Sequence, residues 1–326
     1  MPQAPSFWSH DGMLARVLSP LSAIGSALTA RRMARPGWIA PVPVICCGNV
    51  TVGGAGKTTL VIDLARRLSG RSVHILLRGY GGASKGTRRV MPDDPASLVG
   101  DEALLLARAA PAWIGADRAA SGRAAVEAGA KVLLMDDGLQ NPTLAKTLSI
   151  MVIDGRTGFG NGRVLPAGPL REPVTSAAAR CQAAVLIGPD TTDALRHLPP
   201  HLPVLLADLK QDESISTLTG RKVVAFAGIA LPEKFFTPLR AAGAILVAAR
   251  PFPDHHAFTA RELDALVNEA RVADALLVTT PKDAVRLPPA IRTLVTVVGV
   301  GLEWQAQSEI ERLLDSVIAG GPSGLC

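Results

Sequence analysis

Apolar runs recur along this chain with the spacing of an alternating α/β protein. Helical stretches such as TTLVIDLARRL and DEALLLARAA lie between several of them. Short, nearly charge-free runs are typical of parallel strands that are buried on both faces. The pattern predicts a doubly wound parallel sheet with helices on both faces. The predicted strands cover residues 42–47, 72–77, 131–137, 148–154 and 183–188.

A second series of apolar runs follows, beginning at residues 202, 222, 244, 275 and 293. Helical stretches such as ARELDALVNEARVA separate some of these runs. A chain of 326 residues is long enough for two α/β domains. We therefore expect an N-terminal segment over residues 1–38, a larger α/β domain over 39–207 and a smaller α/β domain over 208–326.

The stretch NVTVGGAGKTTL, residues 49–60, lies between the first predicted strand and a helical stretch. A strand, a Gly-rich turn and a helix that opens on Lys-Thr form a P-loop, whose backbone N–H groups and helix N-terminus bind phosphate. Lys57 would reach the β- and γ-phosphates of a nucleotide, and the Thr58 hydroxyl would bind Mg²⁺. Thr51 stands where the usual pattern has its first glycine. The other predicted nucleotide contacts are Val52, Gly53, Gly54, Ala55 and Gly56.

Two pairs of carboxylates are candidates for the chemistry. Asp136 and Asp137 end an apolar run, as in the Walker B arrangement, which brings a carboxylate to Mg²⁺ at the carboxyl edge of the sheet. Asp101 and Glu102 begin a helical stretch, where acidic residues are also ordinary helix caps. A phosphoryl-transfer enzyme needs a carboxylate to accept the acceptor's proton, so both interpretations of Asp101 stay open.

Basic loops and a histidine pair complete the candidate residues. The loops RGYGGASKGTRR and GRTGFGNGRVLPAGPLREP contain several arginines, whose paired N–H donors match phosphate, although surface arginines often lie in solvent. His255 and His256 are two of six histidines, and such a pair is more often structural or solvated than catalytic.

The charge balance narrows the partners. The net charge is +6, which suits nucleic acid, an anionic membrane or a phosphorylated substrate. One Tyr and seven Phe, without interleaved basic residues, argue against nucleic acid. The cysteines lack metal-binding spacing and are expected to be buried thiols in a reducing cytosol. They are Cys46, Cys47, Cys181 and Cys326, of which the adjacent first two should face opposite sides of a strand.

The N-terminal segment contains no charge from Val17 to Ala30. That stretch is shorter than the roughly twenty apolar residues that span a bilayer. Trp8 and Trp38 flank it, and basic residues follow it at Arg31, Arg32 and Arg35. These features indicate a helix that lies in a membrane interface. An ordinary helix packed on the domain is an equal alternative, and Pro20 interrupts the pattern.

Seven segments together resemble the tetraacyldisaccharide 4'-kinase (lipid A 4'-kinase) family. They are GNVTVGGAGKT, RGYGG, VGDEALLLA, DDGLQN, NGRVLPAGPLREP, PDHHAFT and TTPKDAV, and they appear in the family's order over nearly the whole chain. The resemblance implies transfer of the ATP γ-phosphate, with Mg²⁺, to the 4'-hydroxyl of tetraacyldisaccharide 1-phosphate. The product would be lipid IVA of lipopolysaccharide biosynthesis. It also implies attachment to the cytoplasmic face of the bacterial inner membrane, and no obligate protein partner is evident.

The resemblance also implies residue roles. Lys57 and Thr58 hold ATP and Mg²⁺, and Asp101 looks like a general base that is supported by His256. Glu102, Asp136 and Asp137 resemble the acidic metal-site residues, and the expected substrate contacts are Arg78, Tyr80, Asn141 and Arg171. The family commonly has DDGFQH where this chain has Leu139 and Asn141, and an Asn can still hydrogen-bond a phosphate or sugar.

Three other functions are weighed against the kinase. A membrane-associated ATPase of the ParA/MinD type would need a lysine where Val52 stands. A GTPase would need an N-K-x-D motif, which is not convincingly present, and a D-x-x-G motif, which fails at Leu139. A non-enzymatic nucleotide-binding scaffold would keep the P-loop but would not need Asp101 or the histidine segment.

Overall fold

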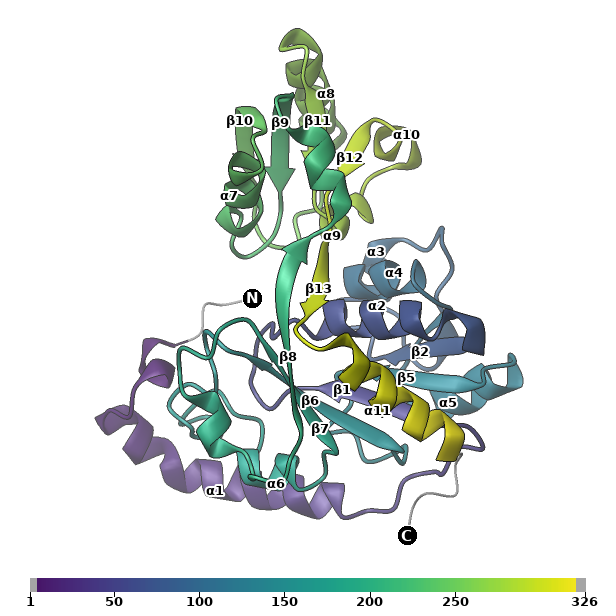
Figure 1. Cartoon of the computed structure of the whole chain (residues 1–326), viewed down its shortest axis with the longest axis vertical. Coiled ribbons are helices and arrows are strands. Elements are labelled where there is room, and N and C mark those ends of the chain that lie inside the picture. The colour runs from purple at the N-terminus through teal and green to yellow at the C-terminus, as the bar shows by residue number, and fades with distance from the viewer. Residues whose placement is uncertain (1–4, 321–326) are drawn as a thin grey trace.

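The computed structural model describes residues 5–320, which form two sheets, one above the other in Figure 1. The larger sheet has nine strands in the order β13-β8-β7-β6-β1-β5-β2-β4-β3. Its strand pairs are parallel except β3–β4 and β8–β13. The strands are β1 (Val44–Gly48), β2 (Val73–Leu77), β3 (Arg88–Arg89), β4 (Ala112–Ile114), β5 (Val132–Asp136), β6 (Leu148–Asp154), β7 (Ala183–Ile187), β8 (Val204–Gln211) and β13 (Val300–Trp304).

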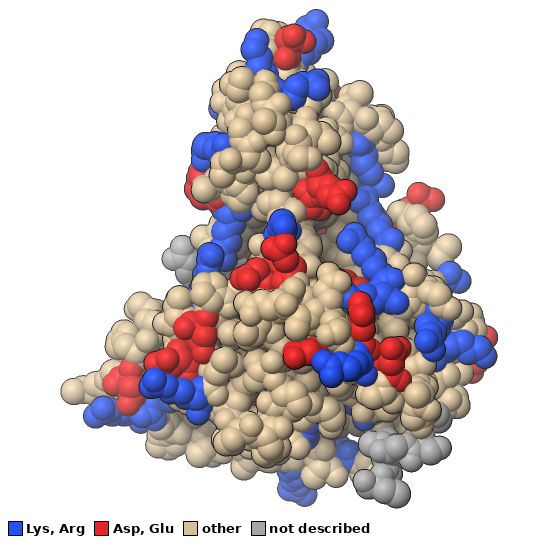
Figure 2. Space-filling model, in the orientation of Figure 1, with Lys and Arg blue, Asp and Glu red and all other residues tan. Residues whose placement is uncertain are grey.

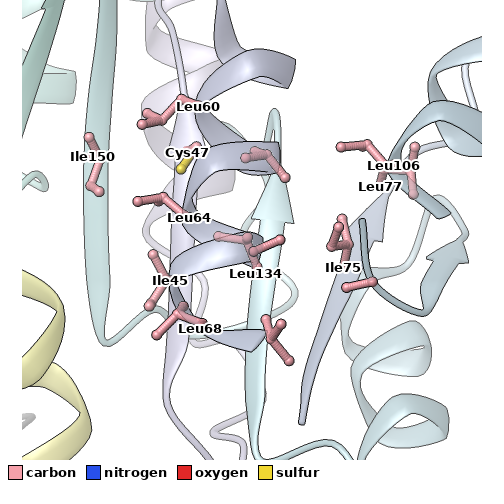
Figure 3. Close-up of a cluster of buried hydrophobic side chains, with 14 of the residues drawn as sticks. Ile45, Cys47, Leu60, Leu64, Leu68, Ile75, Leu77, Leu106, Leu134 and Ile150 are labelled. Carbon is pink, nitrogen blue, oxygen red and sulfur yellow. The ribbon is translucent and has the colours of Figure 1, made fainter. Parts of the chain in front are cut away.

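Two layers of helices cover this sheet, as a doubly wound fold requires. One hydrophobic cluster joins the strands to α2, α4 and α11, and Figure 3 shows part of it, with Leu60, Leu64 and Leu68 against strand residues. The second cluster lies on the opposite face, and Cys46 belongs to it while Cys47 belongs to the first. The predicted opposite orientation of these two cysteines is therefore confirmed. The helices of this domain are α2 (Lys57–Arg67), α3 (Ala96–Val99), α4 (Asp101–Ala107), α5 (Arg118–Glu127), α6 (Val174–Ala178) and α11 (Gln307–Gly320), with short 3-10 turns η2 (Ser69–Arg71) and η3 (Ala194–His197).

The smaller sheet has four parallel strands in the order β10-β9-β11-β12. Phe235 and Phe236 of α7 pack on one face, and Leu263 and Leu266 of α8 pack on the other. The strands are β9 (Lys222–Ala227), β10 (Ile245–Pro251), β11 (Leu276–Thr279) and β12 (Val295–Val297). The helices are α7 (Glu233–Ala241), α8 (Ala260–Val272), α9 (Pro281–Ala284) and α10 (Pro289–Arg292), and the turn η4 (Glu213–Leu218) precedes the sheet.

The chain returns to the larger domain at its end, which differs from the expected division at residue 208. Strand β13 pairs antiparallel with β8, and Ile310 and Leu314 of α11 lie in the larger domain's core. The smaller domain, as the term is used below, therefore covers residues 213–298, because Leu218 and Val298 belong to its core, and β8 and β13 connect it to the larger domain (Figure 1). The apolar runs alone do not reveal this, because a run indicates a strand but not the sheet in which it pairs.

The N-terminal segment forms a short turn, η1 (Ser6–Ser9), and a long helix, α1 (Met13–Met33), that continues through Pro20. Its best 18-residue window has a mean hydropathy of 1.3, so by length and composition alone it could cross a membrane. The expectation that the segment is too short to span is wrong on that criterion. The helix lies along the larger domain (Figure 1), where the Ser22 hydroxyl donates to the Val164 carbonyl at 2.6 Å and accepts from Ala167 N–H at 3.2 Å.

The outer side of α1 carries an apolar stripe. Its large apolar side chains are more than half exposed, and their spacing of three or four residues places them on one helix face. A helix packed on a domain in the ordinary way would bury such a face instead. The residues of the stripe are Met13, Leu14, Val17, Leu21, Ile24 and Leu28.

Candidate active site

The predicted P-loop lies between β1 and α2, as its mechanism requires. Helix α2 begins at Lys57, directly after Gly56, whose φ of 79° is in the left-handed region. A Cβ on Gly56 would lie 2.6 Å from Cδ1 of Ile187, so this position accepts only glycine. A Cβ on Gly53 or Gly54 would meet nothing within 4 Å, so the turn is open on the side where a phosphate would approach.

The first part of the P-loop is bonded to the Gly- and Pro-rich loop that follows β6. Thr51 forms a bridge with Leu170, and the Val52 N–H donates to the Pro169 carbonyl at 2.8 Å. Thr51 is therefore held in an extended pairing that needs no glycine. The Val52 N–H, predicted as a phosphate contact, is directed at protein instead.

Lys57 and the paired carboxylates meet at the carboxyl ends of β1 and β5. The Lys57 ammonium donates to Oδ1 of Asn49 at 2.9 Å and lies 3.8 Å from Oδ1 of Asp137. Thr58 lies beside it in the first turn of α2. Asp136 ends β5 and is 5% exposed.

The environment of Asp136 and Asp137 is suited to a cation. Burial raises the pKa of Asp136 to about 7, and the charges of Glu102 and Asp137 add to this effect. Oδ1 of Asp136 and Oδ1 of Asp137 are buried and accept no hydrogen bond. Two buried carboxylate oxygens without donors fit Mg²⁺, which is hard and prefers oxygen ligands.

Within residues 5–320, no three His, Cys, Asp or Glu side chains come together as a ready-made metal site. Glu102, Asp136 and Asp137 therefore do not form a complete metal cage. Mg²⁺ in kinases is usually held by one or two carboxylates together with substrate phosphates and water, so this donor set fits an ion that arrives with a nucleotide.

Arg171 comes to the same place from the loop after β6. Its Nη1 donates to Oδ2 of Asp137 at 2.8 Å. Gln140 supports this corner, because its amide donates to the Asn49 carbonyl at 3.1 Å and to Oε1 of Glu172 at 3.0 Å. Asn49, Gln140 and Glu172 lie in the motif segments, but no residue pattern predicted a role for them.

Asp101 lies across from the P-loop at the start of α4, facing the smaller domain. Its Oδ2 is 2.8 Å from Nδ1 of His255, whereas Nε2 of His256 lies 3.0 Å from Oε2 of Glu262. The expected contact between Asp101 and His256 is therefore wrong, and His255 makes it. His255 has a φ of 59°, and this tight turn directs the two adjacent side chains to different partners, which the sequence could not reveal.

His256 belongs to the core contacts of the smaller domain. Its ring stacks on Phe252 with centroids 5.0 Å apart. Glu262 is the N3 residue of a capping box with Thr259, and hydrogen bonds from Thr259 and His256 lower the pKa of Glu262 to about 2.

The remaining predicted site residues are less closely gathered. Glu102 lies 3.6 Å from the ammonium of Lys282. Arg78 and Tyr80 are exposed on the loop after β2. Oδ1 of Asn141 accepts from the N–H and hydroxyl of Thr143, so the side chain of Asn141 is used in its own turn.

Two arginines that no sequence motif indicated lie near the carboxylates of the site. Arg118 is 2% exposed, and its Nε has no hydrogen-bond partner. Its guanidinium is close enough to Asp136 and Asp137 to be attracted by their negative charges. Arg286 lies 3.1 Å from Oδ2 of Asp101. In Figure 2, charged side chains gather where the smaller domain meets the larger one.

Comparison with known proteins agrees with this geometry. A model of the family described as tetraacyldisaccharide-1-P 4'-kinase matches residues 14–319. The chain is 58% identical to a tetraacyldisaccharide 4'-kinase of Gluconacetobacter diazotrophicus, over 96% of this chain and 97% of the relative. It is 51% identical to a tetraacyldisaccharide 4'-kinase of Rhodospirillum centenum, over 98% of this chain and 97% of the relative.

A solved structure extends the likeness to the fold. The crystal structure of LpxK from Aquifex aeolicus in complex with ATP is similar, with a TM-score of 0.76 and 27% identity. The match covers 94% of this chain and 100% of that one. This chain belongs to the tetraacyldisaccharide-1-P 4'-kinase family.

Proposed function

We propose that this protein transfers the γ-phosphate of ATP to the 4'-hydroxyl of tetraacyldisaccharide 1-phosphate, giving lipid IVA for lipopolysaccharide biosynthesis. The observation that carries this assignment is the arrangement of a P-loop lysine, two cation-ready carboxylates and a separate Asp–His pair around one edge of the sheet. The family match over residues 14–319 supplies the substrate class. An ATPase of the ParA/MinD type would not need the Asp101–His255 pair.

The nucleotide end of the site uses the P-loop. Gly53, Gly54 and the first turn of α2 hold the triphosphate through backbone N–H groups. Thr58, Asp136 and Asp137 would hold Mg²⁺, with Glu102 nearby, and the ion would neutralise charge on the phosphates. Lys57 leaves Asn49 and Asp137 to contact the transferred phosphoryl group, where its charge is needed.

The acceptor end uses Asp101 as the general base. His255 and Arg286 both contact Oδ2 of Asp101, so Oδ1 is the oxygen that receives the proton of the 4'-hydroxyl. His255 fixes the orientation of the carboxylate through its Nδ1. Arg171, which pairs with Asp137, would contact phosphate once the nucleotide separates the pair.

The apolar stripe of α1 would bind the cytoplasmic face of the inner membrane. Leucine, isoleucine and valine side chains enter the acyl boundary, and Arg31 and Arg32 in the last turn meet anionic headgroups. The opposite side of the helix is bonded to the larger domain through Ser22, so the catalytic domain stays at the membrane surface. A lipid acceptor can then reach the site without leaving the bilayer entirely.

The test is transfer of labelled γ-phosphate from ATP to tetraacyldisaccharide 1-phosphate in detergent micelles, with Lys57→Ala in parallel. A labelled lipid that is absent with the variant would support the assignment. ATP binding without any lipid product from the unaltered protein would overturn it. ATP hydrolysis that is independent of the lipid would favour the ParA/MinD type of function.

A further inference from the structure

Arg286 lies between the two domains, and no role for it follows from the sequence patterns. It comes shortly after α9, in the smaller domain, and its side chain is 6% exposed. Its Nε lies 3.1 Å from Oδ2 of Asp101, which belongs to α4 of the larger domain. A nearly buried guanidinium thus reaches across the domain junction to the proposed general base.

The other contacts of the guanidinium are made within the smaller domain. Nη1 donates to the His256 carbonyl at 2.9 Å, and Nη2 donates to the Gly228 carbonyl at 3.2 Å. Nε also donates to the Lys282 carbonyl at 3.1 Å. All three nitrogens are therefore engaged, and the planar fork fixes the directions of these bonds relative to one another.

Two of these carbonyls are next to His255 or hydrogen-bonded to its backbone. The His256 carbonyl belongs to the next residue, and the Gly228 carbonyl also accepts from the His255 N–H at 3.2 Å. The same guanidinium therefore holds the backbone around His255 and the carboxylate that His255 contacts. Because Asp101 and His255 come from different domains, their relative position depends on groups that bridge the junction.

Asp283 holds Arg286 in place. Its carboxylate is fully buried, and its Oδ1 lies 3.2 Å from Nη2 of Arg286 and accepts from the Gly228 N–H at 3.0 Å. A Cβ on Gly228 would lie 2.9 Å from Oδ1 of Asp283 and 3.4 Å from Nη1 of Arg286. A side chain at residue 228 would therefore press against the Asp283–Arg286 pair.

We propose that Arg286 is a positioning residue for phosphoryl transfer, which holds the Asp101 carboxylate and the backbone around His255 in one fixed arrangement across the domain junction. This inference rests on the proposed role of Asp101 as general base. Arg286 acts through Asp101 and His255 and does not touch the substrate. A misplacement of about 1 Å at a reacting group can cost on the order of a hundredfold in rate, so loss of this bridge should be visible in kcat.

The first experiment is Arg286→Lys in the full chain, assayed with ATP and the lipid acceptor in micelles. Lysine keeps the charge beside Asp283 but cannot reproduce the fork. We expect kcat to fall about tenfold to a hundredfold while the KM for ATP stays within about twofold, because the P-loop is unchanged. Arg250→Lys is the matched control, since Arg250 pairs with Glu269 on the outer surface of the smaller domain.

The fraction of folded protein distinguishes a structural role of Arg286 from a positioning role, because only a structural role lowers activity by unfolding the variant. Circular dichroism at the assay temperature should show that Arg286→Lys is folded, although its Tm should be lower because a lysine leaves some of the buried carbonyls without a donor. Arg286→Gln, which removes the charge, provides a second variant and should lose at least as much kcat. A loss of activity that follows the loss of folded protein in both variants would overturn the proposal.

A double-mutant cycle tests whether Arg286 acts through Asp101. In an Asp101→Asn background, Arg286→Lys should lower kcat by less than about threefold, because both changes affect the same step. Fully multiplicative effects would overturn the positioning role. Near-normal activity of Asp101→Asn alone would instead remove the general base, whereas a defective Asp101→Asn with a normal Arg286→Lys would overturn only this inference.

Discussion

The two ends of the candidate site are built in different ways. At the nucleotide end, Asn49 and Asp137 directly follow the neighbouring strands β1 and β5, and Lys57 begins α2, which packs on the same sheet. At the acceptor end, Asp101 and His255 come from two different domains, and their contact is made across the domain junction. The first arrangement persists as long as the sheet does. The Asp101–His255 contact exists only when the two domains are correctly docked. A domain movement or a mutation at the junction can therefore disable the acceptor end without affecting the nucleotide end.

Lys57→Ala tests the nucleotide end and has the largest expected effect. Transfer should fall by about a thousandfold or more, because no other side chain replaces the ammonium on the transferred phosphoryl. The fold should persist, as measured by Tm. Lys210→Ala, which removes an exposed lysine paired with Glu303, is the control and should leave transfer unchanged. Substantial transfer by Lys57→Ala would contradict the assignment of this loop.

Substitution of the two adjacent histidines tests the acceptor end. His255→Ala should lower kcat by about tenfold to a hundredfold at nearly constant KM for ATP, because Asp101 loses its partner. His256→Ala should change kcat little and instead lower Tm, since this ring stacks on Phe252 and bonds Glu262. Steady-state kinetics and thermal unfolding of both variants decide the matter. A loss of kcat in His256→Ala and not in His255→Ala would support the Asp101–His256 pairing that the family resemblance implied.

Removal of one apolar side chain from the stripe of α1 should weaken membrane binding. Ile24→Glu places a charge in the face that would enter the bilayer, and sedimentation with vesicles containing anionic lipid should fall by roughly tenfold. Ile245→Glu is a matched control, because Ile245 is 54% exposed on β10 and Ile24 is 59% exposed. Equal loss of vesicle binding by both variants would show that α1 has no special part in it.

The smallest expected effect concerns Glu262, whose folded pKa of about 2 lies below its ordinary value of 4.5. A lowered carboxyl pKa contributes stability above the unfolded value, and this stability is lost as pH falls through the folded value. The Tm difference between the unaltered protein and Glu262→Gln should therefore be constant above pH 4.5 and narrow below it. A difference that does not change with pH would show that the charge of Glu262 contributes nothing.

The sequence predicted the nucleotide end better than the acceptor end for a physical reason. Strand, turn and helix of the P-loop are consecutive, so Lys57 and Thr58 are placed by local structure. The contact between Asp101 and a histidine depends on a turn at residue 255 and on the docking of a second domain, neither of which leaves a periodic signal. The resemblance correctly indicated the segment that contains the histidine but not which of two neighbours faces Asp101.

The domain boundary shows the same limit. Every apolar run of the first series became a strand of the larger sheet, because burial on both faces is recorded in the sequence. The return of β13 and α11 to the larger domain depends on which strand β13 pairs with, and an apolar run does not specify its partner. Trp304 of β13 donates its indole N–H to Asp63 of α2, a contact between residues that are far apart in the chain.

The loop that follows β6 connects the N-terminal helix to the P-loop. One part of it is hydrogen-bonded to Ser22 of α1, and Pro169 is hydrogen-bonded to Val52 of the P-loop. Only a few residues separate these two attachments, so under the proposed function the membrane surface that binds α1 and the phosphate-binding turn would be held at a constant separation. A sugar headgroup that projects from the bilayer by that separation would then reach the site, and a shorter or more deeply buried one would not.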